Sequence, residues 1–217
     1  LEGSIRKWLL PQLSAPLLFV RDPLAVYAIF LAFRLGTFSR RIGLQWLMAM
    51  SALISLGALL GMIVREQLPI TLYIIGIRTY FLHLPLIWIF AEAFNRDDCE
   101  HIGRWLLRFS PVMAALMVFQ YIGKRSDWIN LGAGGGTQIS ANIGEKIRAA
   151  GTFSFNSGTG YYFGLIVAFA IAHLLMSQAR KLDYMALASA VVAASVSISR
   201  STVGILLIVA ILPFTQI

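Results

Sequence analysis

The stretch from Leu44 to Val64 contains no charged residue, and this feature constrains the chain more than any other. At about 1.5 Å of rise per residue, a helix over this stretch reaches about 30 Å, the thickness of the hydrocarbon core of a bilayer. The rest of the chain has a similar character, because 58% of its 217 residues are hydrophobic and only 13% are charged. Soluble domains have about 25% charged residues. We therefore exclude a soluble fold and predict an all-α, transmembrane helical bundle.

Short charged or polar segments divide the chain into several apolar stretches. We predict helices over about 23–38, 44–64, 69–94, 99–122, 159–178, 182–198 and 202–214, which gives a polytopic bundle of about six or seven spans. Pro85 is expected to kink the third of these helices, and residues 95–98 are expected to provide an N-cap for the fourth. Gly57 and Gly61 have the four-residue spacing that lets a second helix approach closely.

One long hydrophilic segment, residues 123–158, interrupts the apolar pattern and is predicted to be a loop outside the membrane. We detect no internal repeat and no second domain, so residues 1–217 are interpreted as a single integral-membrane domain. The chain begins without Met and ends soon after an apolar run. We therefore expect it to be part of a longer polytopic protein.

The balance of 18 Lys and Arg against 10 Asp and Glu predicts an orientation. Short cytoplasmic connections collect Lys and Arg, whereas long loops translocate largely regardless of their charge. One alternating set of short connections holds Arg34, Arg40, Arg41, Arg96, Arg104, Arg108, Arg180 and Lys181, and the other holds Arg21, Arg65 and Arg200. The first set is assigned to the cytoplasm, which places the 123–158 loop outside it. The positive charge thus indicates membrane orientation and not a nucleic-acid partner.

Metal, disulfide and nucleotide sites are poorly supported. Cys99 is the only cysteine, and the three histidines lie far apart in the sequence. His83 and His173 are interpreted as hydrogen-bonded interior residues, and His101 as a surface residue. The glycine run 132–136 lacks the Lys-Ser or Lys-Thr that a phosphate-binding loop needs. We expect neither a metal nor a cofactor.

Two arginines stand in or beside apolar segments. Arg78 lies within the predicted third span, where an arginine costs at least about 2.5–3.5 kcal/mol to insert unless it faces protein or water. It either snorkels to the interface or is buried with a polar partner or a function. Arg200 follows the sixth span and is either a helix-end charge or a functional cation.

The end of the long loop combines a cation with aromatic and hydrogen-bonding side chains. Arg148 is followed by Phe153, Phe155, Asn156 and Tyr161 just before the fifth span. Arginine binds phosphate through a bidentate fork, and aromatic rings can stack on sugars. This mixture suits a sugar diphosphate, and the alternative is an ordinary solvated loop.

Three segments together resemble the O-antigen polymerase and O-antigen ligase family of bacterial polysaccharide assembly. They are GIRTYFLHLPLIWI with Arg78, RAAGTFSFNSGTGYY with Arg148, and SISRSTVG with Arg200. Their order and spacing carry the resemblance, which covers residues 78–204. Members of that family are polytopic inner-membrane proteins with about 10 to 14 spans and a large periplasmic loop.

The resemblance implies a metal-independent, inverting glycosyltransferase in O-antigen or exopolysaccharide synthesis. Its donor would be an undecaprenyl-diphosphate-linked saccharide, and its partners would be membrane lipids and other polysaccharide-assembly proteins. Arg148, Arg78 and Arg200 match the family's arginines and are the implied catalytic residues, while Phe153, Phe155, Asn156 and Tyr161 are the expected substrate-binding residues. No residue clearly matches the later-loop histidine of the ligases.

Two other function classes stay open. A flippase for lipid-linked saccharides, or another transporter, would also need cations within the membrane, but it would be expected to have paired broken helices in two matching halves. A membrane scaffold would need neither Arg78 nor the aromatic loop around Arg148.

Overall fold

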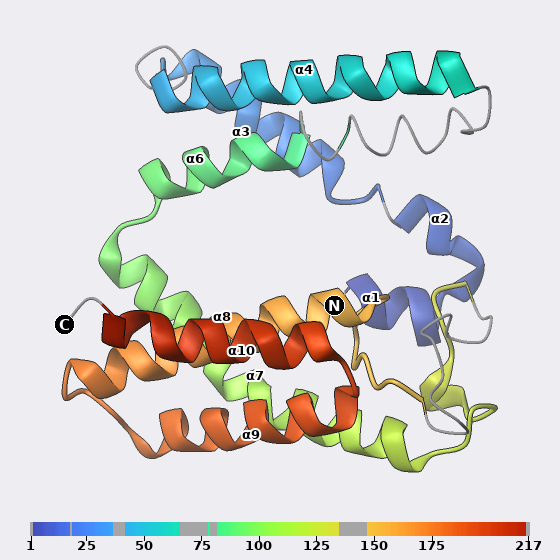
Figure 1. The fold of residues 1–217 in the computed structure, drawn as a ribbon, viewed down its shortest axis with the longest axis vertical. Helices are drawn as coiled ribbons and strands as arrows, with labels where there is room; N and C mark the ends of the chain where they lie inside the picture. Colours follow the sequence, from blue (N-terminus) through green and yellow to red (C-terminus); the bar gives the residue numbers. More distant parts are fainter. Residues whose placement is uncertain are drawn as a thin grey trace. The chain divides into compact units, whose positions relative to one another are not determined.

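A computed structural model describes residues 2–17, 19–36, 42–65, 78, 82–134 and 147–215. All regular elements in this part of the chain are helices (Figure 1), so the predicted all-α class is confirmed. Three helical stretches, Pro11–Arg34, Arg96–Ile122 and Ser157–Leu175, are long and apolar enough to cross a membrane. The chain divides into two compact units. One comprises Leu1–Leu18 and Cys99–Ile217, and the other comprises Phe19–Asp98.

The helix positions follow the predicted pattern closely. The α-helices are α1 (Glu2–Ser4), α2 (Ser14–Leu17), α3 (Asp22–Arg34), α4 (Ile42–Arg65), α6 (Leu84–Ala93), α7 (Arg96–Ile122), α8 (Asn156–Leu175), α9 (Lys181–Ser197) and α10 (Arg200–Ile211). The helix predicted over 69–94 lies mostly outside the described residues, and α6 forms its end. The other predicted helices match α3, α4 and α7 to α10 within a few residues at most ends.

Local sequence signals explain several helix boundaries. At the start of α7, the Asp98 backbone N–H donates to Asn95 Oδ1 (2.9 Å), and the Asn95 N–H donates to Asp98 Oδ2 (3.2 Å). This reciprocal pair is a capping box, and it confirms the predicted N-cap. Pro85 lies in the first turn of α6, where proline is tolerated because its missing N–H has no helical partner there. Leu82 and His83 before it are helical too, and most of the predicted 69–94 helix lies outside the described residues, so the kink at Pro85 stays a prediction.

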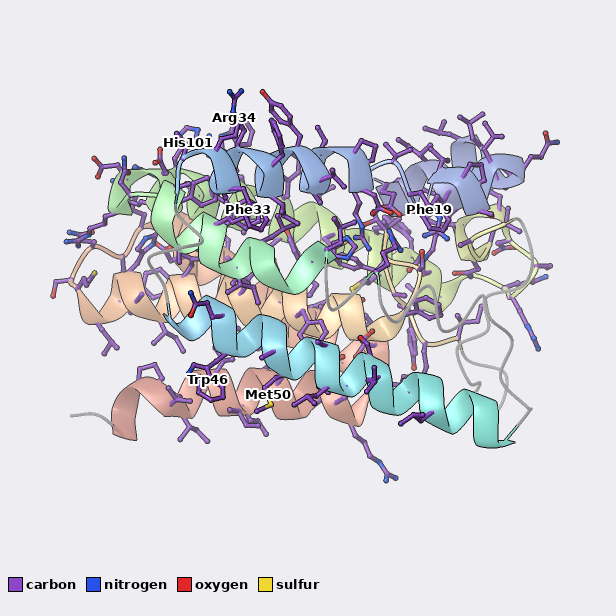
Figure 2. All side chains as sticks on the ribbon, turned by 90° about the horizontal axis from the view of Figure 1, so that it is seen from above. Phe19, Phe33, Arg34, Trp46, Met50 and His101 are labelled. Atoms are coloured by element: carbon purple, nitrogen blue, oxygen red, sulfur yellow. The ribbon has the colours of Figure 1, made fainter. Side chains whose placement is uncertain are left out.

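In the Phe19–Asp98 unit, α3 and α4 each pack against α6. A Cβ built at Gly57 or Gly61 meets no described atom within 4 Å, so no described helix approaches α4 closely at these glycines. Figure 2 shows large apolar side chains projecting outward from the helices, among them Phe33, Trp46 and Met50, which are 61%, 64% and 51% exposed. Surfaces this apolar are typical of helices that face lipid.

In the other unit, α7 runs antiparallel to α8. Tyr162 of α8 donates a hydrogen bond to the Leu106 carbonyl of α7 (3.0 Å), and Phe169, farther along α8, lies against Gly103, which is earlier in α7. The buried core joins Leu107 and Met117 of α7 to residues of α8 and α9, namely Phe163, Ile166, Val167, Ala170, Ile171, Ala186, Ala190 and Ala193. The alanines of α9 allow close helix packing.

Helices α8 and α10 run in the same direction. A Cβ built at Gly160 lies 3.2 Å from Ile205 Cδ1, and one built at Gly164 lies 2.8 Å from Ile205 Cγ2 and 4.0 Å from Val209. The beginnings of both helices therefore meet at one end of this unit, and Figure 1 shows both starting on the right. We call this end of the Leu1–Leu18 and Cys99–Ile217 unit the loop end, because residues 123–134 and 147–155 lie there.

Candidate functional site

The segment that carries Arg148 is packed into the loop end. Ile147, Ala149 and Ala150 are buried, with exposed fractions of 3%, 0% and 0%. Between them Arg148 is half-buried, and its Nε atom is buried without a hydrogen-bond partner among the described residues. A buried polar atom without a partner carries a free-energy cost that a bound ligand can relieve. The backbone thus holds Arg148 in place, while its Nε has no acceptor among the described residues.

A turn at Gly151 fixes the backbone next to Arg148. Gly151 has φ +60°, a conformation that favours glycine because it has no Cβ. Its N–H donates to Gln120 Oε1 (2.8 Å), and its carbonyl accepts from Gln120 Nε2 (3.1 Å) and from Lys7 Nζ (3.0 Å). Both Gln120 and Lys7 have no exposed surface. The turn is therefore attached both to α7 and to the N-terminal segment.

Further buried hydrogen bonds hold Gln120 and its surroundings. Gln120 Nε2 also donates to the Ile129 carbonyl (3.0 Å). Asn130 Nδ2 donates to the backbone carbonyls of Gln120 (3.1 Å) and Lys124 (2.9 Å). The end of α7 and residues 124–130 are thereby joined into one hydrogen-bonded network. Burial lowers the pKa of Lys7 to about 8, because the charged ammonium loses its water.

The aromatic residues surround the start of α8. Thr159 donates to the Ala150 carbonyl (3.0 Å), which attaches the first turn of α8 to the Arg148 segment. The Phe153 ring packs on Tyr162 with centroids 5.8 Å apart, whereas Phe155 and Tyr161 are 70% and 69% exposed. Asn156 is the first residue of α8, and the N-cap residue before it, Phe155, makes no side-chain capping hydrogen bond.

Arg200 begins α10 and is exposed at the same loop end. Ile198 adopts a left-handed conformation (φ 46°) between α9 and α10. The Ser199 hydroxyl then accepts from the Thr202 N–H (3.4 Å) and caps α10. Because α8 and α10 are parallel, the fold brings Arg200 to the end that carries Arg148, Phe155 and Tyr161.

Arg78 belongs to the Phe19–Asp98 unit, where it is paired. Its Nε and Nη2 atoms donate to the two oxygens of Asp22 at 2.6 and 2.8 Å. Its guanidinium also lies 4.7 Å from the Phe19 ring centroid, and its side chain is 10% exposed. His83 Nε2 lies 3.6 Å from the same carboxylate. Of the two interpretations of Arg78, snorkelling and a buried pair, this geometry matches the buried pair.

The sequence patterns did not single out Lys7, Gln120 or Asn130 for this site. A lysine ahead of the first span and two amides beside a loop are common in surface positions. A weak signal existed for Gln120, since it is a polar residue within an otherwise apolar helical run. Residues 135–146, which include the end of the 132–136 glycine run, lie outside the described residues. Comparison with known proteins adds no assignment, because no protein-family model, curated protein or solved structure matches the chain.

Proposed function

We propose that this protein transfers glycan from an undecaprenyl-diphosphate donor outside the cytoplasm, as a polymerase or ligase of lipid-linked saccharides in a multi-pass inner-membrane bundle of about six or seven spans. The observation that carries the proposal is Arg148. Its backbone is fixed by the Gly151 turn, and its Nε is buried without an acceptor among the described residues. The resemblance of three arginine segments to the O-antigen family supports the same function.

The loop end has the groups that such a donor requires. The diphosphate carries negative charge, and Arg148 and Arg200 supply cations at the end where α8 and α10 begin. The exposed Phe155 and Tyr161 rings provide faces on which sugars can stack. Because α8 is apolar and long enough to cross a membrane, its first turn would lie near the lipid headgroups, where a lipid diphosphate lies.

The proposed reaction uses the arginines of the loop end to stabilise the leaving group. An acceptor hydroxyl attacks the anomeric carbon, a new C–O bond forms with inversion, and the bond to the lipid diphosphate breaks. The leaving diphosphate gains negative charge, and the arginines stabilise that charge through bidentate, charge-assisted hydrogen bonds. The proton of the acceptor hydroxyl passes to a base or to solvent.

The test uses the full-length gene in a strain that lacks its own polymerase or ligase. The surface polysaccharide on a gel distinguishes a ladder, a single added unit and no change. Arg148→Ala should abolish the product, because a charge-assisted contact to phosphate contributes about 1.5–3 kcal/mol. Arg148→Lys should retain a reduced yield, since lysine keeps the charge and loses the fork.

Lys124→Ala is the matched control, because it removes an exposed cation of the same loop end. It should leave yield and chain length unchanged, and all variants should be expressed equally. An unchanged polysaccharide from Arg148→Ala would contradict the site and would favour a transporter or a scaffold.

The orientation has its own test, in a variant whose exposed Cys99 is replaced by serine. A cysteine at Gly134 should react with a membrane-impermeant thiol reagent in intact cells, and one at Lys181 should not. The reverse labelling would place the loop end in the cytoplasm and would exclude the proposed reaction.

A further inference from the structure

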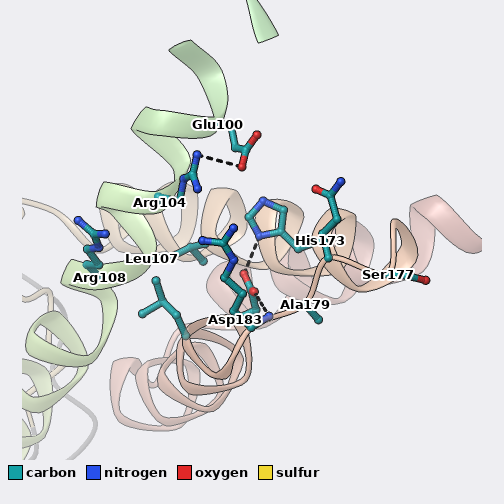
Figure 3. Close-up of a pocket in the computed structure, with 11 residues that line it drawn as sticks. Glu100, Arg104, Leu107, Arg108, His173, Ser177, Ala179 and Asp183 are labelled. Atoms are coloured by element: carbon teal, nitrogen blue, oxygen red, sulfur yellow. Dashed lines mark hydrogen bonds and ion pairs between the residues drawn. The ribbon is translucent and has the colours of Figure 1, made fainter. Parts of the chain in front are cut away.

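We propose a second ligand site, a pocket for a phosphate group at the opposite end of α8 from Arg148. The pocket has a volume of about 590 Å³ and includes Arg104 and Arg108 of α7, His173 of α8, Arg180 and Asp183. Figure 3 shows Arg104 and Arg108 on α7, His173 near the end of α8 and Asp183 near the start of α9 around this pocket. The proposal does not depend on the glycan-transfer function.

The acidic side chains of the pocket already have partners. Glu100 is paired with Arg104 (3.1 Å). Asp183 is 1% exposed, and its two oxygens contact His173 Nδ1 (2.7 Å) and the Arg180 backbone N–H (2.7 Å). Both Asp183 oxygens are thus occupied, and the ion pair of Glu100 is with Arg104.

Two cations in the pocket consequently lack an acidic partner among the described residues. The Arg108 guanidinium lies 5.3 Å from the Trp105 ring centroid, a contact that orients the side chain without neutralising it. Arg180 uses its backbone, and not its guanidinium, in the bonds with Asp183. Two arginines that line one polar pocket suit a phosphate, which accepts several charge-assisted hydrogen bonds.

The His173–Asp183 pair adds to the pocket an imidazole whose hydrogen-bonding role depends on its protonation. With Nδ1 held by the carboxylate, the other ring nitrogen lies on the side away from Asp183 (Figure 3). Histidine at this position can donate to a phosphate oxygen when its Nε2 carries a proton. The ligand chemistry is thus a phosphate monoester or diester bound by two arginines and a histidine.

The position of the pocket suggests two sources for this phosphate. The pocket lies at the ends of α7 and α8, the two helices of this unit that can cross a membrane, so a phospholipid headgroup can reach it. A free phosphate ester from the adjacent aqueous phase has the same chemistry.

Three probes distinguish these sources with the purified full chain in a neutral detergent. They are dihexanoyl phosphatidic acid, glycerol phosphate and dihexanoylglycerol, which are a lipid with phosphate, a phosphate without acyl chains, and a lipid without phosphate. We expect both phosphate probes to bind more tightly than dihexanoylglycerol. If phosphatidic acid binds at least tenfold more tightly than glycerol phosphate, the pocket takes a lipid headgroup. If the two bind with equal affinity, it takes a soluble phosphate ester.

The variants assign the binding to the pocket. Arg108→Gln and Arg180→Gln should each weaken the binding of the better phosphate probe about tenfold or more. The corresponding lysine variants, which preserve charge and packing, should lose less of this affinity. Lys181→Gln is the matched control, because it removes an exposed cation next to Arg180 that does not line the pocket, and its affinity should stay within about twofold of wild type. The proposal is overturned if no phosphate probe binds, or if all arginine variants bind like the wild type.

Discussion

Replacing Gln120 with methionine should release the segment that carries Arg148. Methionine retains the length and the apolar stem of glutamine but makes none of its amide hydrogen bonds. The change removes the acceptor of the Gly151 N–H and the donor to the Ile129 carbonyl, while the Gly151 carbonyl retains Lys7. A buried N–H without a partner costs about 1–3 kcal/mol, and each other lost bond costs about 0.5–1.5 kcal/mol. We expect a local destabilisation of about 2–4 kcal/mol.

Trypsin cleavage after Arg148 measures this opening directly, because cleavage of a packed segment follows the population of its open form. At about 1.4 kcal/mol per tenfold change, the cleavage rate should rise roughly 30-fold to 1,000-fold. Cleavage after the exposed Arg180, in the turn between α8 and α9 and outside this network, is the internal reference and should stay constant.

Phe119→Leu is the matched control, since Phe119 is the neighbouring residue and is 65% exposed. Its cleavage rates should stay within about twofold of wild type. The reasoning is refuted if Gln120→Met is expressed and folded but raises cleavage after Arg148 less than about threefold, which corresponds to under about 1 kcal/mol.

Three further predictions concern stability in detergent, measured by thermal unfolding. Burial lowers the pKa of Lys7 to about 8 from 10.5, so between these pH values the unfolded chain binds more protons than the folded one. As the pH rises through this range, the stability of the wild type relative to Lys7→Met should therefore increase by up to about 1.4 kcal/mol per pH unit. Equal pH profiles of the two proteins would contradict a buried Lys7. Gly164→Ala should cost about 1–3 kcal/mol, because its Cβ would lie 2.8 Å from Ile205 Cγ2, and Gly164→Ala with Ile205→Ala should lose less than the sum of the single changes; strict additivity would argue against the contact. Thr202→Val should be neutral or stabilising by up to about 1 kcal/mol, because the Thr202 hydroxyl is buried without a partner among the described residues; a clear loss of stability would show that the hydroxyl is bonded.

The sequence by itself determined the helical class and most helix positions. Long apolar runs need backbone hydrogen bonds within each segment when they meet lipid, and only helices supply these bonds locally. Capping chemistry is local too, which is why Asn95 and Asp98 predicted the start of α7. The hydrogen-bonded histidine expected at position 173 follows from the cost of burying an unpaired imidazole, and its partner Asp183 lies just across the turn between α8 and α9.

The tertiary structure alone decided which polar groups meet. Lys7 and Gly151 are separated by 144 residues and Gln120 and Gly151 by 31, so no local pattern relates them. The same holds for Arg78 and Asp22, which are 56 residues apart and form a buried ion pair. Helix direction made a similar difference, because the parallel run of α8 and α10 brings Arg200 to the end that carries Arg148. These contacts depend on how apolar faces pack, and many sequences with the same hydrophobic pattern would pack them differently.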